Sequence, residues 1–120
     1  MRRALIAGVI LWLIGTAMFR LGGQSIIHAP SVSRTVPAYL LYFVVSAILV
    51  RLLLPRLGLA RESWPAATTL IILPTLLLDP FSTAFFPVVF PNIPPEAAPT
   101  FGGLMLMNCA GAVVAGWLRI

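Results

Sequence analysis

The chain is poor in charged residues and especially poor in acids. Only 9% of its 120 residues are charged, with eight basic residues and three acidic ones. A typical soluble domain has about a quarter of its residues charged. Because 60% of the residues are hydrophobic, the polar groups are too few to cover a surface in water. The sequence therefore predicts a protein whose solvent is lipid, with no separate soluble domain.

Groups for catalysis are equally scarce. The three acids are Glu62, Asp79 and Glu96, which lie too far apart in the chain for two of them to share a helix face for acid–base catalysis. The patterns HExxH, GxSxG, Walker A and CxxC do not occur. We therefore expect no enzyme, no catalytic residue, no metal site and no cofactor, although contact with a bound lipid or pigment is compatible with the sequence.

Cysteine and histidine occur once each. Cys109 has no partner for an intrachain disulfide, and as a lone cysteine in an apolar segment it is expected to act as a small hydrophobic residue. His28 follows the first apolar run and could ligate haem or a chlorophyll-type pigment. No second ligand accompanies it, so we expect an interfacial polar residue instead.

Long apolar runs predict an all-α membrane protein, a bundle of four transmembrane helices in a single transmembrane domain spanning residues 1–120. One helix needs about 20 residues to cross the hydrocarbon core, and four runs qualify, at about residues 4–21, 37–54, 64–79 and 100–118. We expect the first run to be an uncleaved helix, not a signal peptide. Pro37 suits a helix start, and Pro80 predicts a break or kink at Asp79. Residues 81–99, rich in phenylalanine and proline, predict an interfacial cap.

The distribution of arginine predicts the orientation. With the N-terminus inside, six arginines fall on the cytoplasmic side and only Arg20 and Arg34 on the other, which favours cytoplasmic N- and C-termini. The cytoplasmic set is Arg2, Arg3, Arg51, Arg56, Arg61 and Arg119. A net charge of +5 would suggest nucleic acid in a soluble protein, but here the arginines flank apolar runs. We expect lipid as the partner and no nucleic acid.

Arg20 and Asp79 are the most informative ionisable residues. Each lies about 14 to 16 residues after the start of its helix, Arg20 in the first and Asp79 in the third. Because these two helices run in the same direction, we expect both residues at similar depth near the outer leaflet. An ionisable group in a membrane helix is costly unless it is paired, hydrated or able to reach the surface. A structural ion pair between the first and third helices is the leading interpretation. Separate headgroup contacts and a functional site at Asp79 are the alternatives.

The fourth run contains the other packing signals. Asn108 lies near its middle and is expected to form a polar contact between helices. Gly111, Ala112, Ala115 and Gly116 fit the small-xxx-small pattern that allows two helices to approach closely. Ala4 and Gly8 repeat the pattern in the first run.

Three stretches carry a resemblance to a known family. They are residues 11–24 of the first run, residues 78–92 with Leu-Asp, Phe-Phe-Pro and Val-Phe-Pro-Asn, and residues 95–108 with Pro-Glu-Ala-Ala, Phe-Gly-Gly and Asn108. The chain is similar to DUF5367, a family of small bacterial four-span membrane proteins of unknown function. The resemblance implies four spans in a bacterial inner membrane and supplies no activity.

Two functions are compatible with these features. The first is a non-catalytic subunit or scaffold within a larger membrane complex, photosynthetic or respiratory, with other membrane subunits as partners. The second is a small homo-oligomeric transporter or channel that uses Asp79 as its membrane carboxylate.

Overall fold

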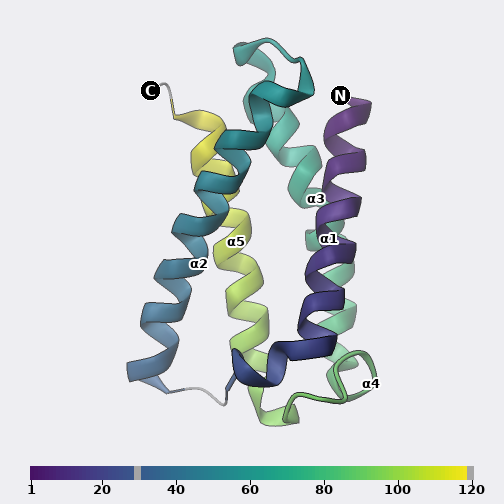
Figure 1. Ribbon diagram of the computed structural model, residues 1–120, viewed down its shortest axis with the longest axis vertical. Coiled ribbons are helices and arrows are strands. Elements are labelled where there is room, and N and C mark those ends of the chain that lie inside the picture. Colours follow the sequence, from purple (N-terminus) through teal and green to yellow (C-terminus); the bar gives the residue numbers. More distant parts are fainter. Residues whose placement is uncertain (29–30, 119–120) are drawn as a thin grey trace.

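The computed structural model describes residues 1–28 and 31–118. Four long helices run up and down through this part of the chain, namely α1 (Arg2–Gly22), α2 (Val32–Leu53), α3 (Trp64–Ala84) and α5 (Ala98–Trp117) (Figure 1). Each is, with its flanking turns, long and apolar enough to cross a membrane. The predicted all-α fold with four membrane-spanning helices is therefore confirmed, and the chain is a multi-pass membrane protein.

Two prolines lie inside helices where the sequence predicts boundaries. Pro37 is the sixth residue of α2, and α3 passes through Pro74 and Pro80 to end at Ala84. A break at Asp79 is therefore wrong, while a kink within the continuous helix stays a prediction. A proline inside a helix costs about 3 kcal/mol in water. In lipid, a broken helix would leave several backbone groups without partners, each at a cost of several kcal/mol. Continuing the helix is the less costly solution.

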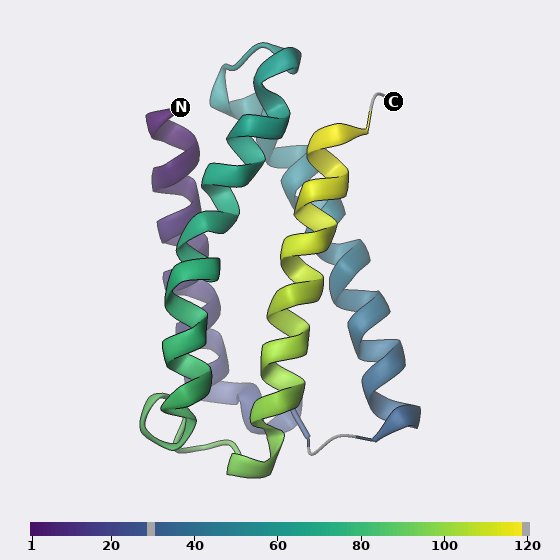
Figure 2. The same cartoon turned by 180° about the vertical axis from the view of Figure 1, so that it is seen from behind.

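The helices pack in the order α1, α3, α5, α2. Helix α5 packs against both α2 and α3, and α1 packs against α3, while α1 and α2 make few direct contacts. Viewed from behind, α3 and α5 lie nearest the viewer with α1 and α2 beyond them (Figure 2). Glycines allow close approach, with Gly8 against Ile71 and Gly111 against Phe43. Small residues therefore set the distances between the neighbouring helices.

The buried apolar core is divided into two clusters, one at each end of the bundle. The cluster near the termini includes Ala4, Leu54 and Ala115, and the cluster at the opposite end includes Phe19 and Phe101. Polar side chains in the middle of the helices lie between these two clusters. The polar groups described below therefore lie between the two apolar clusters.

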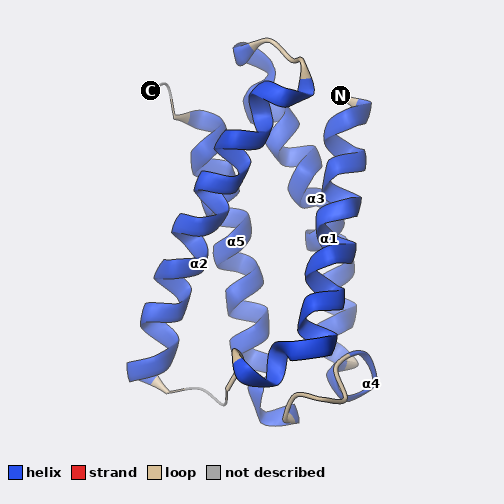
Figure 3. Ribbon diagram, viewed as in Figure 1, coloured by secondary structure: helices blue, strands red, loops and turns tan. Residues whose placement is uncertain are grey.

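The cap covers the second cluster. It consists of α4 (Phe86–Val89), the turn that follows it and the short helix η4 (Pro95–Ala97), at the end of the bundle opposite the termini (Figure 3). The ring centroids of Phe90 and Phe101 lie 4.9 Å apart, and both side chains are buried. The predicted cap at residues 81–99 is thus shorter than expected, because residues 81–84 belong to α3 and α5 already begins at Ala98.

The described arginines separate between the two ends as the sequence predicts. Five lie at the end that holds both termini and the α2–α3 turn, namely Arg2, Arg3, Arg51, Arg56 and Arg61. Arg20 and Arg34 lie at the cap end, and Arg119 is outside the described residues. Which end faces the cytoplasm remains a prediction from this charge asymmetry.

Candidate functional site: a buried carboxylate beside a cavity

Among the described residues, the carboxylate of Asp79 has one hydrogen-bond partner. The indole Nε1 of Trp12 donates to Oδ1 at 2.9 Å, whereas Oδ2 is buried and has no hydrogen-bond partner. The residue is only 6% exposed. A buried carboxylate can accept several hydrogen bonds, and leaving them unmade costs free energy. Asp79 is therefore under-coordinated as the chain alone presents it.

Asp79 lies on the cap side of the middle of α3. It is the sixteenth of the 21 residues of this helix, and its partner Trp12 is the eleventh of the 21 residues of α1. Because Gly8 of α1 lies against Ile71 of α3, Arg20 is four residues, roughly 6 Å along the helix axis, nearer the cap than Asp79. The two residues thus differ in depth by about one helical turn.

Arg20 and Asp79 do not form an ion pair in the described part of the chain. Instead, Arg20 is exposed, and its Nη1 donates to the backbone carbonyl of Val89 at 3.0 Å. Close by, Nδ2 of Asn92 donates to the carbonyl of Phe19 at 2.9 Å and to Oε1 of Gln24 at 2.6 Å. Arg20 and Asn92 together attach the cap to the end of α1. The predicted ion pair between Arg20 and Asp79 is therefore wrong, and Arg20 contacts the cap instead.

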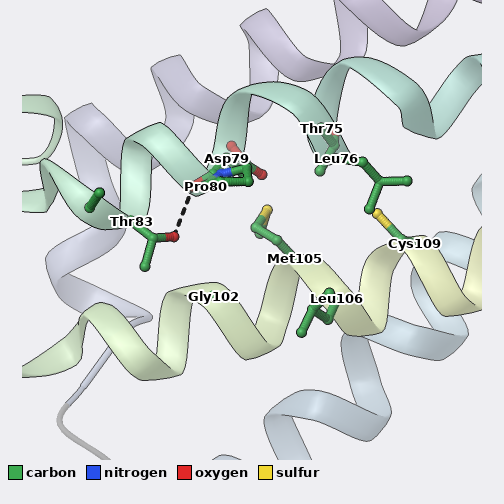
Figure 4. A pocket seen from close by; sticks show the side chains of 10 residues that line it. Thr75, Leu76, Asp79, Pro80, Thr83, Gly102, Met105, Leu106 and Cys109 are labelled. Atoms are coloured by element: carbon green, nitrogen blue, oxygen red, sulfur yellow. Dashed lines mark hydrogen bonds between the residues drawn. The ribbon is translucent and has the colours of Figure 1, made fainter.

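A cavity of about 420 Å³ lies between α3 and α5, beside Asp79. In Figure 4 the sulfur atoms of Met105 and Cys109 point from α5 toward α3. Leu76 is 43% exposed and Leu106 65% exposed, so the rim of the cavity lies on the outer surface that faces lipid. The lining residues are Thr75, Leu76, Asp79, Pro80, Thr83, Ala84, Gly102, Met105, Leu106 and Cys109.

The α3 wall of the cavity offers further hydrogen-bonding groups. Hydroxyls elsewhere on α3 bond to the carbonyl four residues before them, as Thr83 does to Asp79 at 2.9 Å (Figure 4). Thr75 makes no such bond among the residues that the structure describes. Pro80 has no N–H to donate to the carbonyl of Leu76. Helix α3 thus lines the cavity with a carboxylate and a hydroxyl, next to a carbonyl that lacks its usual helical donor.

The other residues that the sequence singled out on α5 do not line the cavity. The backbone carbonyl of Asn108 accepts a hydrogen bond from Ser46 Oγ at 2.6 Å, while its side-chain Nδ2 meets only the sulfur of Met105, at 3.9 Å. The interhelical contact is thus made by the backbone of Asn108, and its amide stays within α5. Gly111, Ala112, Ala115 and Gly116 are all buried.

His28 is exposed at the end of the first helical segment. No group of three or more His, Cys, Asp or Glu side chains that could hold a metal ion occurs among residues 1–28 and 31–118. Glu62 and Glu96 are likewise exposed, in the turn before α3 and in the cap.

Sequence reasoning did not identify Trp12, Thr75, Met105 and Cys109 as parts of this site. A signal for Trp12 was present, because an indole N–H in the middle of an apolar span needs an acceptor. Asp79 is the only acid outside the turns. The cavity-lining residues of α5 carried no comparable signal, since Met105 and Cys109 are ordinary residues for a membrane helix.

The fold and this site define a small multi-pass membrane protein with a buried carboxylate beside a lipid-facing cavity. The chain belongs to a family of unknown function (DUF5367), whose model matches residues 30–120. No curated protein and no solved structure matches the chain. The matched range contains Asp79 and the whole cavity lining, whereas Trp12 and Arg20 lie before it.

Proposed function

We propose that the protein is a small membrane transporter that binds its substrate at Asp79. The observation that carries this proposal is the buried carboxylate within α3, with one oxygen unpartnered, beside a cavity at the lipid surface. An ionisable side chain inside a membrane helix costs up to about 3 kcal/mol on insertion scales. An apolar residue would pack there without this cost, so a substrate that needs the carboxylate explains its presence.

The alternative of a non-catalytic subunit in a larger complex has less support. The exposed side chains of α2, such as Leu40, Leu41 and Ile48, are apolar, as lipid alone requires. A subunit interface would be favoured by polar groups on that surface that need a partner chain. Asp79, by contrast, lies against the α3–α5 cavity. Homo-oligomerisation, the inner-membrane location and the absence of catalysis stay predictions from the sequence.

Reconstituted protein provides the test. Proteoliposomes containing the wild type, Asp79→Asn or Glu96→Gln would be exposed to panels of organic cations, neutral compounds and anions while charge movement and uptake are recorded. Glu96→Gln is the matched control, because it removes an exposed carboxylate from the cap. We expect at least one class to be transported by the wild type and the control but not by Asp79→Asn, with all three proteins equally helical.

Two results would overturn the proposal. Transport that is unchanged in Asp79→Asn would remove the carboxylate from the mechanism. Absence of transport for every class, together with purification in mild detergent as part of a large particle with other proteins, would favour the subunit instead.

A further inference from the structure

We infer that the α3–α5 cavity takes an apolar organic cation that enters sideways from the lipid. This inference rests on the proposed function and specifies its substrate class. It follows from the sign of the charge at the cavity, from the number of oxygen ligands there and from the direction in which the cavity opens.

The groups around the cavity select for positive charge. Its lining contains one carboxylate, Asp79, and no arginine or histidine. The hydroxyl of Thr75 can accept a hydrogen bond, and Pro80 withholds the helical donor from the carbonyl of Leu76. The nearest arginine along α1, Arg20, donates to the cap at Val89. An anion would therefore meet a carboxylate with no compensating cation in the cavity wall.

A bare metal ion is a poor fit for the same cavity. Calcium takes six to eight oxygen ligands, and magnesium keeps several waters in an octahedral shell. Besides Asp79, the wall offers two hydroxyls, those of Thr75 and Thr83, and backbone carbonyls, which is fewer oxygens than either ion requires, and most of the lining is apolar. A cation that carries its own apolar groups can satisfy both the carboxylate and this lining.

The position of the opening indicates the route. The exposed residues of the rim, Leu76 and Leu106, lie on the outer surfaces of α3 and α5. A cation with an apolar body concentrates in the membrane before it meets the protein. It could then reach Asp79 between the two helices without crossing the cap or the Arg-rich end.

Binding would supply the charge compensation that Asp79 lacks without breaking its existing bond. Trp12 approaches Oδ1 from α1, whereas the cavity lies on the α5 side of α3. A cation in the cavity and the indole of Trp12 can therefore act on the carboxylate from different sides. The ligand completes the environment of a side chain that α1 has already positioned.

Methionine methyl signals can report this binding directly. The chain has four methionines, of which Met105 lines the cavity and Met18 is 63% exposed on α1. Protein labelled with ¹³C-methyl methionine in lipid nanodiscs would be titrated with benzyltrimethylammonium. The control ligand is neopentylbenzene, which has the same shape with carbon in place of the charged nitrogen. Met105→Leu assigns the signal.

We expect the cation to shift the Met105 signal saturably while Met18 stays unchanged. The neutral ligand should bind more weakly by about tenfold or more, because it gains no attraction from the carboxylate. Asp79→Asn should remove this preference while leaving the other methyl signals in place. The comparison of two ligands on the wild-type protein does not depend on how the variant folds.

Each other outcome has a defined meaning. Equal binding of both ligands would show an apolar cavity without charge selection and would overturn the cation inference. No shift of Met105 with either ligand would overturn the cavity as the binding site. In both cases Asp79-dependent transport of another class would preserve the proposed function. Conversely, selective binding without any transport would leave this inference standing and remove the transporter.

Discussion

Helix α5 has two very different neighbours. Toward α2 the packing is closed, with Gly111 against the Phe43 carbonyl and Ser46 Oγ donating to the Asn108 carbonyl at 2.6 Å. Toward α3 the helices touch closely at Gly116, which meets Thr68 near the termini. Further along, the same pair separates around a cavity of about 420 Å³. One helix thus forms a tight interface on one side and an open one on the other.

The difference shows which interface holds the bundle together. Apolar helices gain no hydrophobic driving force from meeting each other in lipid, so association depends on close packing and interhelical hydrogen bonds. The α2–α5 interface has both. The α3–α5 interface gives up packing contacts around the cavity and leaves an oxygen of Asp79 unpartnered. Stability is thus concentrated on one side of α5 and binding capacity on the other.

The largest effect is expected from Gly111→Ala in the closed interface. A Cβ at this position would collide with the backbone of Phe43, and backbone cannot move aside as a flexible side chain can. Overpacking of this kind costs about 1 to 3 kcal/mol, so α2 should separate from α5. Unfolding in mixed micelles with increasing denaturing detergent, followed by circular dichroism, would measure the loss.

Gly15→Ala is the matched control for that substitution. Gly15 is also a helical glycine, but a Cβ there meets nothing within 4 Å. We expect unchanged or slightly higher stability, since alanine favours the helix by up to about 1 kcal/mol. Equal destabilisation by both substitutions would mean that the cost comes from the helix itself, not from the α2–α5 contact.

An intermediate effect is expected from Trp12→Phe on the open side. The change removes the one donor to the Asp79 carboxylate among the described residues and should cost up to about 1.7 kcal/mol, the upper end for interhelical hydrogen bonds in membrane proteins. In the Asp79→Asn background the same change should cost less, because the amide is neutral. The double-mutant cycle measures this coupling in the unfolding free energy.

Arg20→Gln supplies the control for the cycle. Since Arg20 donates to Val89 and not to Asp79, its effect should add to that of Asp79→Asn within about 0.5 kcal/mol. Strong coupling between Arg20 and Asp79, with none between Trp12 and Asp79, would contradict this assignment and support the ion pair that the sequence favoured.

The fold was predictable because long apolar runs in lipid must satisfy their backbone hydrogen bonds within helices. The end of α3 was not, because the local preference of Pro80 to break a helix is weaker than the cost of exposed backbone groups in the membrane. Aqueous helix rules misplace such boundaries. Counting residues along each helix suggested Arg20 as the partner of Asp79, whereas the direction of each side chain around its helix decides which groups meet.

Of the residues at the candidate site, only Asp79 was predictable from the sequence. Asp79 is identifiable from sequence because an acid inside an apolar run is rare and costly. The cavity depends on how α3 and α5 separate beyond Gly116, and no residue pattern encodes a volume between two helices. Trp12 belongs to α1, 67 residues before Asp79, so a contact of this kind appears only when the helix order in the bundle is known.

The smallest effect is expected from Ser46→Ala, a change in the closed α2–α5 interface. The hydroxyl donates to a backbone carbonyl that α5 already uses in its own helix, so its loss leaves no acceptor without a bond. Interhelical hydrogen bonds in membrane proteins contribute about 0.6 kcal/mol on average, and we expect a loss of that order in the same unfolding assay. A cost above that of Gly111→Ala would mean that hydrogen bonding, not the close approach of small residues, closes this interface. The contrast between the two sides of α5 would then be one of polar pairing, since Ser46 is bonded across its interface whereas Oδ2 of Asp79 has no partner.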